Sequence, residues 1–338
     1  MSIAKESNQD GLILGMDGGG SKTACLLMDL QGNILVETEG IGINYRQYGV
    51  SNVLATIRQL TDDCMKTAGV SEASLTGVCI GMPSYGEHPP TDNQLAEALY
   101  EMFPRLMLVN DVHVGWAGSL ALDSGINLVS GTGSIAFGVD GKGRAARSGG
   151  WSERIGDEGS SYWLAVMGMQ LFTKQSDGRQ PRGPLYRLIK EKFRLSNDFE
   201  FVPLIEEQYL PYREKVASFH YLVAQAAEEQ DITVIDLYQK AAEELFSLVM
   251  SVFNQLGKPA ECRQVSYSGG TFKVGEVLLG PLRKLLDKEG LHLQAPMFSP
   301  VAGALLLAIR QFASQHLDSV LAALTSWQSL TPSSFSPL

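Results

Sequence analysis

Residues 14–33 read LGMDGGGSKTACLLMDLQGN. The apolar run over residues 12–17 predicts a short buried strand, and a second strand over residues 23–29 follows a glycine-rich turn. Gln31-Gly32-Asn33 is a tight-turn signal, after which residues 34–37 read as a third strand. Three consecutive strands joined by short turns predict an antiparallel meander.

The same pattern returns in the second half of the chain. Residues 128–143 read LVSGTGSIAFGVDGKG, which is again a strand, a glycine turn, a strand and a tight turn. A third glycine pair ends the strand QVSYSGG at residues 264–270. This internal similarity indicates a repeated structural unit. We therefore expect two halves that face a cleft and place their glycine loops on one ligand.

Helical periodicity accounts for most of the remaining sequence, and the first 120 residues read βββαβαβα. Further strands are predicted over residues 75–80, 106–109, 127–130, 135–140 and 265–268. Helices are predicted over residues 50–68, 91–103, 112–122, 160–173, 184–193, 214–228, 233–256, 272–288 and 300–312. Residues 326–338 are rich in Ser and Pro, and we expect them to fray.

Length and composition limit the class of protein. Because single cores seldom grow beyond about 300 residues, a chain of 338 residues is expected to hold two domains. Glycine contributes 35 residues, about a tenth of the chain against a usual share of about 7%. The net charge is −10 and no basic stripe is visible, which argues against a nucleic-acid partner. Backbone N–H groups could still hold a small anion.

The four cysteines form no C-x-x-C pair and do not stand at zinc spacing from a histidine. Cys25 and Cys79 lie in apolar runs and are expected to be buried. The chain shows neither a signal-peptide pattern nor an apolar run of 18 residues. We predict a reducing, cytoplasmic location without membrane contact.

The glycine loops fit neither of two familiar nucleotide motifs. In Gly20-Ser21-Lys22-Thr23 a serine separates glycine from lysine, and a strand follows where a P-loop needs a helix. Residues 131–136 fit G-x-G-x-x-A, but a strand again follows. A glycine turn between antiparallel strands can instead form an anion nest of successive N–H groups. The alternative is an ordinary hairpin, and finding two matching loops favours the nest.

Two aspartates stand at predicted strand ends. Asp17 precedes the first glycine turn, where it could hold hydrated Mg²⁺ beside a phosphate or simply cap the turn. Asp111 lies where a strand meets a helix, as a general base or as an N-cap. His113 is expected to be structural.

Residues 148–163 read SGGWSERIGDEGSSYW, a segment dense in glycine, tryptophan and carboxylates. Trp151 could face a sugar ring or fill a core. Asp157 and Glu158 could accept hydrogen bonds from hydroxyl groups or cap the helix that follows. The composition favours a binding loop over a plain connector.

Together these motifs resemble the eukaryotic-type N-acetylglucosamine kinases of the BadF/BadG/BcrA/BcrD ATPase family, within the actin–hexokinase–Hsp70 superfamily. The resemblance runs from about residue 12 to residue 312. It is carried by Asp17-Gly-Gly-Gly-Ser21, Asn110-Asp111, Ser130-Gly-Thr-Gly-Ser134, Gly149-Gly-Trp151, Gly156-Asp-Glu-Gly-Ser160 and Ser268-Gly-Gly270.

The resemblance implies an α/β fold of two ribonuclease-H-like (actin-like ATPase) domains, each a mixed sheet with a βββαβα core, facing an interdomain cleft. We expect domains at residues 1–118 and 119–312 and a partly loose extension at 313–338. The residues it assigns to ATP are Gly18, Gly19, Gly20, Ser21, Gly131, Thr132, Gly133, Gly269, Gly270 and Lys273. Those it assigns to the sugar are Asn44, Asp111, Ser134, Gly150, Trp151, Ser152 and Asp157. Asp111 would be the catalytic base, and Asp17 would hold Mg²⁺ through water.

The implied reaction is ATP-dependent phosphorylation of the 6-hydroxyl group of an amino sugar, with N-acetylglucosamine as the expected acceptor and a homodimer as the expected assembly. Glucosamine, N-acetylmannosamine and N-acetylmuramic acid are alternative acceptors, and Trp151 argues against glucosamine. An ATPase activator with an iron–sulfur cluster and a non-catalytic regulator are rival classes. Residues 81–92 form a longer, more proline-rich loop than the resemblance leads us to expect, and residues 228–233 lack its Gly-Asp pair.

Overall fold

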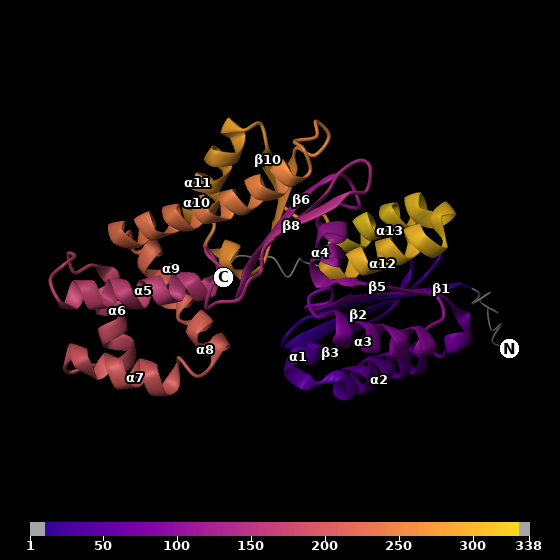
Figure 1. Cartoon of the computed structure of the whole chain (residues 1–338), viewed down its shortest axis with the longest axis horizontal. Helices are drawn as coiled ribbons and strands as arrows, with labels where there is room; N and C mark the ends of the chain where they lie inside the picture. Colours follow the sequence, from indigo (N-terminus) through magenta and orange to yellow (C-terminus); the bar gives the residue numbers. More distant parts are fainter. Residues whose placement is uncertain (1–10, 331–338) are drawn as a thin grey trace. The chain divides into compact units, whose positions relative to one another are not determined.

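The computed structural model describes residues 11–330. These residues form two compact units. Within the described residues, the first unit combines residues 11–123 with residues 296–330, and the second unit comprises Ser124–Ala295. Each unit has its own sheet (Figure 1), and each has its own apolar core.

The first unit contains a five-stranded mixed sheet with the order β3-β2-β1-β4-β5. Its strands are β1 (Leu12–Gly18), β2 (Lys22–Asp29), β3 (Ile34–Ile41), β4 (Leu75–Met82) and β5 (Leu106–Asn110). The predicted meander is confirmed, because β1 pairs antiparallel with β2 and β2 pairs antiparallel with β3. The strands β4 and β5 add in parallel on the other side of β1.

Helices cover both faces of this sheet (Figure 1). The helices of this unit are α1 (Tyr45–Tyr48), α2 (Val50–Ala68), α3 (Pro89–Met102), α4 (Asp111–Ser119), α12 (Pro300–Phe312) and α13 (Leu317–Leu330). Leu14 and Met16 alternate along β1 and share a core with Ile57 of α2. On the opposite face, a Cβ atom on Gly15 would lie 2.9 Å from the backbone nitrogen of Leu305. Both faces are therefore buried, which explains the continuous apolar run in β1.

The unit boundary differs from the predicted domain boundary, because residues 296–312 belong to the first unit. Helix α12 packs on β1, β4 and α4. Its contact with α4 requires a glycine, since a Cβ atom on Gly303 would lie 2.0 Å from the carbonyl oxygen of Val114. The predicted extension from residue 313 is helical through α13, and residues 331–338 lie outside the described part.

The second unit repeats the topology of the first, with the order β10-β9-β6-β7-β8. Its strands are β6 (Gly125–Ser130), β7 (Ser134–Val139), β8 (Ala145–Gly149), β9 (Gln264–Ser268) and β10 (His292–Gln294). The antiparallel meander β6-β7-β8 and the parallel β9 and β10 match β1-β2-β3, β4 and β5. The internal similarity predicted from the glycine turns is confirmed, and so is the α/β fold class.

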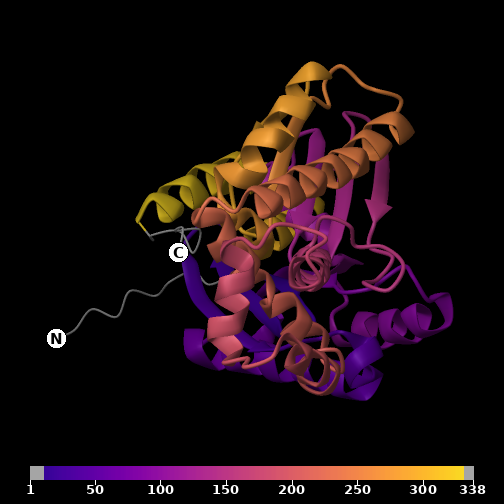
Figure 2. The same cartoon turned by 90° about the vertical axis from the view of Figure 1, so that its left-hand side faces the viewer.

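Helices make up most of the second unit, and Figure 2 shows the long α10 beside α11 across its sheet. They are α5 (Ser161–Ser176), α6 (Pro184–Phe193), α7 (Phe201–Gln208), α8 (Arg213–Ser218), α9 (His220–Glu228), α10 (Ile232–Gln255) and α11 (Glu276–Lys288). The helix predicted over residues 214–228 is two helices that meet at Phe219. The helix predicted over residues 272–288 is a 3-10 turn (Gly270–Val274) followed by α11, divided at Gly275. Within residues 11–330, no helix is both long enough and apolar enough to cross a bilayer.

Candidate functional site

The first glycine loop joins β1 to β2. Its backbone is tightly packed, because a Cβ atom on Gly18 would lie 2.7 Å from the carbonyl oxygen of Gly81. The Gly20 carbonyl accepts a hydrogen bond from the Tyr48 hydroxyl at 3.0 Å. The N–H groups of Gly20 and Ser21 donate to no residue that the structure describes. The loop therefore offers two successive backbone donors, as an anion nest does.

The second glycine loop, between β6 and β7, also offers two successive backbone N–H donors. The Gly131 N–H donates to the Gly133 carbonyl at 2.9 Å, which closes the turn. Among residues 11–330, the N–H groups of Thr132 and Gly133 have no acceptor. A Cβ atom on Gly131 would meet nothing within 4 Å, so space lies beside this loop. The start of α5 fixes the loop, since the Ser161 N–H donates to the Gly131 carbonyl at 2.8 Å.

A cavity of about 300 Å³ opens beside this second loop. Gly131, Thr132 and Gly270 line it, so the structure brings these three predicted ATP residues together. Lys273 is exposed and is not among the lining residues. Gly269 also has a packing role, since its φ is +106° and a Cβ atom there would lie 2.2 Å from the Ser130 carbonyl oxygen.

The far wall of this cavity comes from α8 and α9 and was missed by the sequence analysis. Burial lowers the pKa of His220 to about 4, so its imidazole is neutral at pH 7. His220 Nε2 is buried and has no hydrogen-bond partner in the described part of the chain. Tyr221 beside it is 60% exposed. A buried polar atom without a partner on a cavity wall suits a ligand that supplies the missing hydrogen bond. No motif surrounds these residues, so the sequence carried no signal for them.

Two carboxylates lie near each other in the first unit. Burial and the neighbouring Asp111 charge raise the pKa of Asp17 to about 8, against the opposing effect of Lys22. No described residue donates a hydrogen bond to the Asp17 carboxylate, which removes the turn-capping interpretation. The N-cap of α4 is Asn110, so the capping alternative for Asp111 is also wrong. Asp111 is the first residue of α4, and its Oδ1 accepts from the Val112 N–H at 2.9 Å.

This pair could hold a cation together with other ligands. Two repelling, partly desolvated carboxylates are stabilised by a positive charge between them. In the part of the chain that the structure describes, no three His, Cys, Asp or Glu side chains are grouped as a metal site. A cation held here would therefore need water or phosphate oxygens, which is the ligand set that Mg²⁺ prefers.

The proline-rich loop after β4 is fixed beside Asn44 and Asn110. Asn44 is the N-cap of α1, where its Oδ1 accepts from the Arg46 N–H at 3.0 Å. Its Nδ2 has no partner among residues 11–330, and can donate to a ligand. Asn110 Nδ2 donates to the Tyr85 carbonyl at 2.8 Å. The buried Asp92 carboxylate accepts from the His88 N–H at 2.9 Å. The hydroxyl of Tyr45, next to Asn44, lies 2.9 Å from the Ser84 carbonyl oxygen. The loop therefore contacts the segments that hold Asn44 and Asn110.

The predicted sugar segment of the second unit is partly exposed and partly fixed. Trp151 is 70% exposed, which excludes the core-filling interpretation. Gly150 and Ser152 on either side of it both have positive φ, +72° and +86°. Burial raises the pKa of Asp157, although the Ser134 N–H and Arg213 donate to its carboxylate. The Ser134 hydroxyl donates to the Glu158 carbonyl at 2.7 Å, so Ser134 and Asp157 both hold this loop in place.

The remaining histidine and cysteine predictions concern the cores. His113 is mostly buried, and burial together with Arg310 lowers its pKa to about 4, as expected of a structural histidine. The predicted burial of Cys25 and Cys79 is confirmed, and Cys64 and Cys262 are buried as well. Cys25 Sγ lies 3.4 Å from Cys64 Sγ. Buried thiols are poorly placed to bind a cluster that bridges subunits.

Comparison with known proteins agrees with these features. The BadF/BadG/BcrA/BcrD ATPase family matches residues 14–308. An N-acetylmuramic acid/N-acetylglucosamine kinase of Clostridium acetobutylicum is 28% identical, over 81% of this chain and 90% of that protein. An N-acetyl-D-glucosamine kinase of Dictyostelium discoideum is 25% identical, over 88% of this chain and 98% of that protein. The solved structure of a candidate N-acetylglucosamine kinase from Chromobacterium violaceum has a TM-score of 0.70 at 26% identity, covering 88% of this chain and 99% of the other.

Proposed function

Since this chain belongs to the BadF/BadG/BcrA/BcrD ATPase family, we propose that it is an ATP-dependent kinase acting on the 6-hydroxyl group of an amino sugar. The observation that carries the proposal is the matching pair of N–H donors, Gly20 with Ser21 and Thr132 with Gly133, each between two antiparallel strands. The names of its relatives support N-acetylglucosamine as the acceptor.

Both glycine loops bind ATP phosphates in this proposal, the first through Gly18, Gly19, Gly20 and Ser21 and the second through Gly131, Thr132 and Gly133. The cavity beside Gly131 and Gly270 receives the adenosine. His220 Nε2 lines it and hydrogen-bonds the nucleotide. Gly269 and Lys273 remain proposed ligands of the nucleotide, and Gly269 also shapes the loop.

Asp111 is the catalytic base. It accepts the proton of the sugar 6-hydroxyl group, whose oxygen attacks the γ-phosphorus in line while the bond to the bridging oxygen breaks and ADP leaves. Asp111 lies in the first turn of α4, where the helix N-terminus favours a negatively charged group. Asp17 would hold Mg²⁺ through water, and that ion when bound neutralises charge on the phosphate oxygens.

Asn44, Gly150, Trp151, Ser152, Ser134 and Asp157 bind the sugar in this proposal. Ser134 and Asp157 also hold the loop that carries Trp151 in place. The free Nδ2 of Asn44 supports a hydrogen bond to a sugar hydroxyl or carbonyl oxygen. The exposed indole of Trp151 supports packing against the sugar ring. One relative's name includes N-acetylmuramic acid, so that acceptor belongs in the same assay.

A coupled ADP-release assay tests this function across N-acetylglucosamine, glucosamine, N-acetylmannosamine, N-acetylmuramic acid and glucose. We expect N-acetylglucosamine to give the highest kcat/KM. The kinase proposal is wrong if no sugar raises ADP release above the sugar-free rate. Iron-dependent absorbance of the purified protein would instead favour an ATPase activator with an iron–sulfur cluster. Absence of ATP binding would favour a non-catalytic regulator. Light scattering tests the proposed homodimer.

A further inference from the structure

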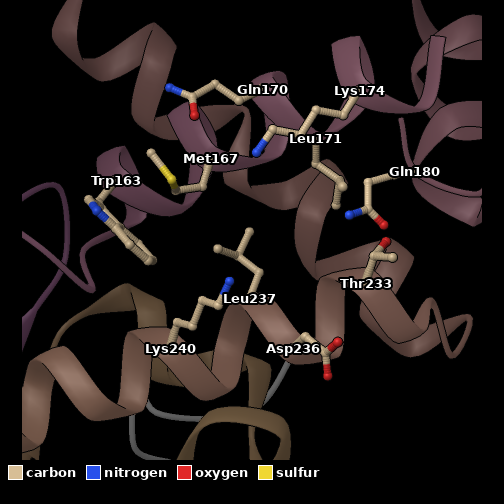
Figure 3. A pocket seen from close by; sticks show the side chains of 10 residues that line it. All are labelled: Trp163, Met167, Gln170, Leu171, Lys174, Gln180, Thr233, Asp236, Leu237 and Lys240. Atoms are coloured by element: carbon tan, nitrogen blue, oxygen red, sulfur yellow. The ribbon is translucent and has the colours of Figure 1, made fainter. Parts of the chain in front are cut away.

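A second pocket lies between α5 and α10 of the second unit, apart from every residue assigned above. Figure 3 shows its lining side chains, which come from both helices and the turn after α5. Its volume is about 190 Å³. This is below the roughly 300–1,000 Å³ of pockets for drug-sized ligands, so the pocket suits a smaller molecule.

Two lysines direct their ammonium groups into this pocket. Figure 3 shows the Nζ atoms of Lys174, from α5, and Lys240, from α10, both turned toward its centre. Both lysines are exposed, and neither makes an ion pair with any residue between 11 and 330. Asp236 also lines the pocket, but its carboxylate points away from both ammonium groups. In a chain of net charge −10, two unpaired cations at one pocket indicate a site for an anion.

The rest of the lining favours a ring with hydroxyl groups. Trp163 and Met167 are half-buried at one end of the pocket, and the indole leaves part of its surface open to it. An indole face packs well against the C–H face of a sugar ring, because both surfaces are apolar and the aromatic face carries partial negative charge. Gln170, Gln180 and Thr233 add polar groups that can donate to or accept from hydroxyl groups.

We propose that this pocket binds a phosphorylated sugar, with the phosphate on Lys174 and Lys240 and the ring against Trp163. The site itself does not depend on the proposed kinase activity. The effect of the bound sugar phosphate on the KM for ATP does rest on the proposed kinase function.

The first turn of α5 connects this pocket to the second glycine loop. The Trp163 N–H donates to the Ser160 hydroxyl at 3.1 Å. Ser161, which follows Ser160, donates its N–H to the Gly131 carbonyl at 2.8 Å. Helix α10 supports the same segment, because a Cβ atom on Gly159 would lie 2.7 Å from Leu245. A ligand that shifts Trp163 would therefore move the Gly131 loop and change the KM for ATP.

Calorimetric titration of the full chain with N-acetylglucosamine 6-phosphate tests the site. The protein is first saturated with ADP and N-acetylglucosamine, so that binding at the acceptor site is suppressed. We expect Lys174→Ala with Lys240→Ala to weaken binding about tenfold or more, as the loss of charge-assisted hydrogen bonds does. The matched control, Lys284→Ala with Lys288→Ala, removes two exposed charges of α11 and should leave binding unchanged. Trp163→Phe should weaken binding without unfolding the chain.

The site is disproved by equal affinity of the wild type and the Lys174/Lys240 double variant, or by no binding to the wild type. Inorganic phosphate provides the second probe. If it binds as tightly as the sugar phosphate, the ring is not recognised and the assignment of a sugar phosphate is wrong. The coupling is tested separately, because the sugar phosphate should change the KM for ATP about twofold or more in the wild type and not in the double variant. A chain that phosphorylates no sugar but still binds the sugar phosphate would disprove the kinase function alone.

Discussion

The Tyr45 hydroxyl lies 2.8 Å from Oδ1 of the buried Asp92 and 2.9 Å from the Ser84 carbonyl oxygen. It ties the helix that Asn44 caps to the proline-rich loop after β4. That loop carries Glu87, which pairs with Arg46 at 3.4 Å. This hydroxyl group therefore links the segment of Asn44, a residue of the proposed acceptor site, to the proline-rich loop.

Tyr45→Phe should raise the KM for the sugar several-fold and leave the KM for ATP unchanged. The loss of one hydrogen bond costs about 0.5–1.5 kcal/mol, so the chain should stay folded. Steady-state kinetics with each substrate varied in turn measures the effect. Tyr100→Phe, which alters an exposed tyrosine of α3, is the control. An equal rise in both KM values would disprove a role confined to the acceptor.

Asp111→Asn should abolish phosphoryl transfer and leave ATP affinity within about twofold of the wild type. An amide cannot accept the hydroxyl proton, and general-base catalysis contributes about 10²- to 10⁴-fold. Single-turnover kinetics gives the transfer rate and calorimetry gives the affinity for ATP. Asp62→Asn, at an exposed position of α2, controls for the lost charge. Transfer at the wild-type rate would remove Asp111 from the role of base.

Gly131→Ala and Gly269→Ala should separate ligand binding from packing. A methyl group on Gly131 meets no protein atom within 4 Å, so stability should change little while the KM for ATP rises. A methyl group on Gly269 would lie 2.2 Å from the Ser130 carbonyl oxygen, at a φ of +106°. That variant should lose at least about 1–3 kcal/mol of unfolding free energy. Urea unfolding and ATP titration of both variants measure the two effects, and a reversed outcome would contradict both assignments.

Asp198→Asn should reduce stability more at pH 7 than near pH 3. Burial alone would raise the pKa of Asp198, but hydrogen bonds from Lys190, Ser176 and Tyr186 outweigh it and lower the pKa to about 2. An aspartate with a lowered pKa in the folded state stabilises the fold above its unfolded pKa of about 4 and loses that effect as the pH falls toward 2. Urea unfolding at several pH values should show the gap between variant and wild type narrowing below pH 4, whereas exposed Asp177→Asn should show a smaller change. A constant gap would contradict the lowered pKa.

The sequence predicted the parts of the fold that local patterns determine. Apolar alternation and glycine turns identified both meanders, because strand faces and turns are set by neighbouring residues. The placement of α12 was not predicted, since its contact with α4 depends on Gly303 and Gly118, which are distant in sequence. Long-range packing of this kind leaves no local signal.

In the candidate site, the sequence predicted the residues that lie in motifs and missed those that do not. The glycine loops and Asp111 carry motifs, and the structure removed the capping alternatives for Asp17 and Asp111. The cavity wall at His220 and Tyr221 carries no motif, because α8 and α9 are ordinary amphipathic sequence. Asp92 resembles any acidic residue in the first turn of a helix, so its bond to Tyr45 could not be anticipated.

The return of the chain to the first unit has a consequence for biosynthesis. Helix α12 covers one face of the first sheet, yet it is translated after the whole second unit, residues 124–295. Domains generally fold as they leave the ribosome, N-terminal parts first. In this chain, all strands of the second unit are synthesised before the first unit is complete. Until α12 has been synthesised, the face of the first sheet that contains Gly15 therefore stays uncovered.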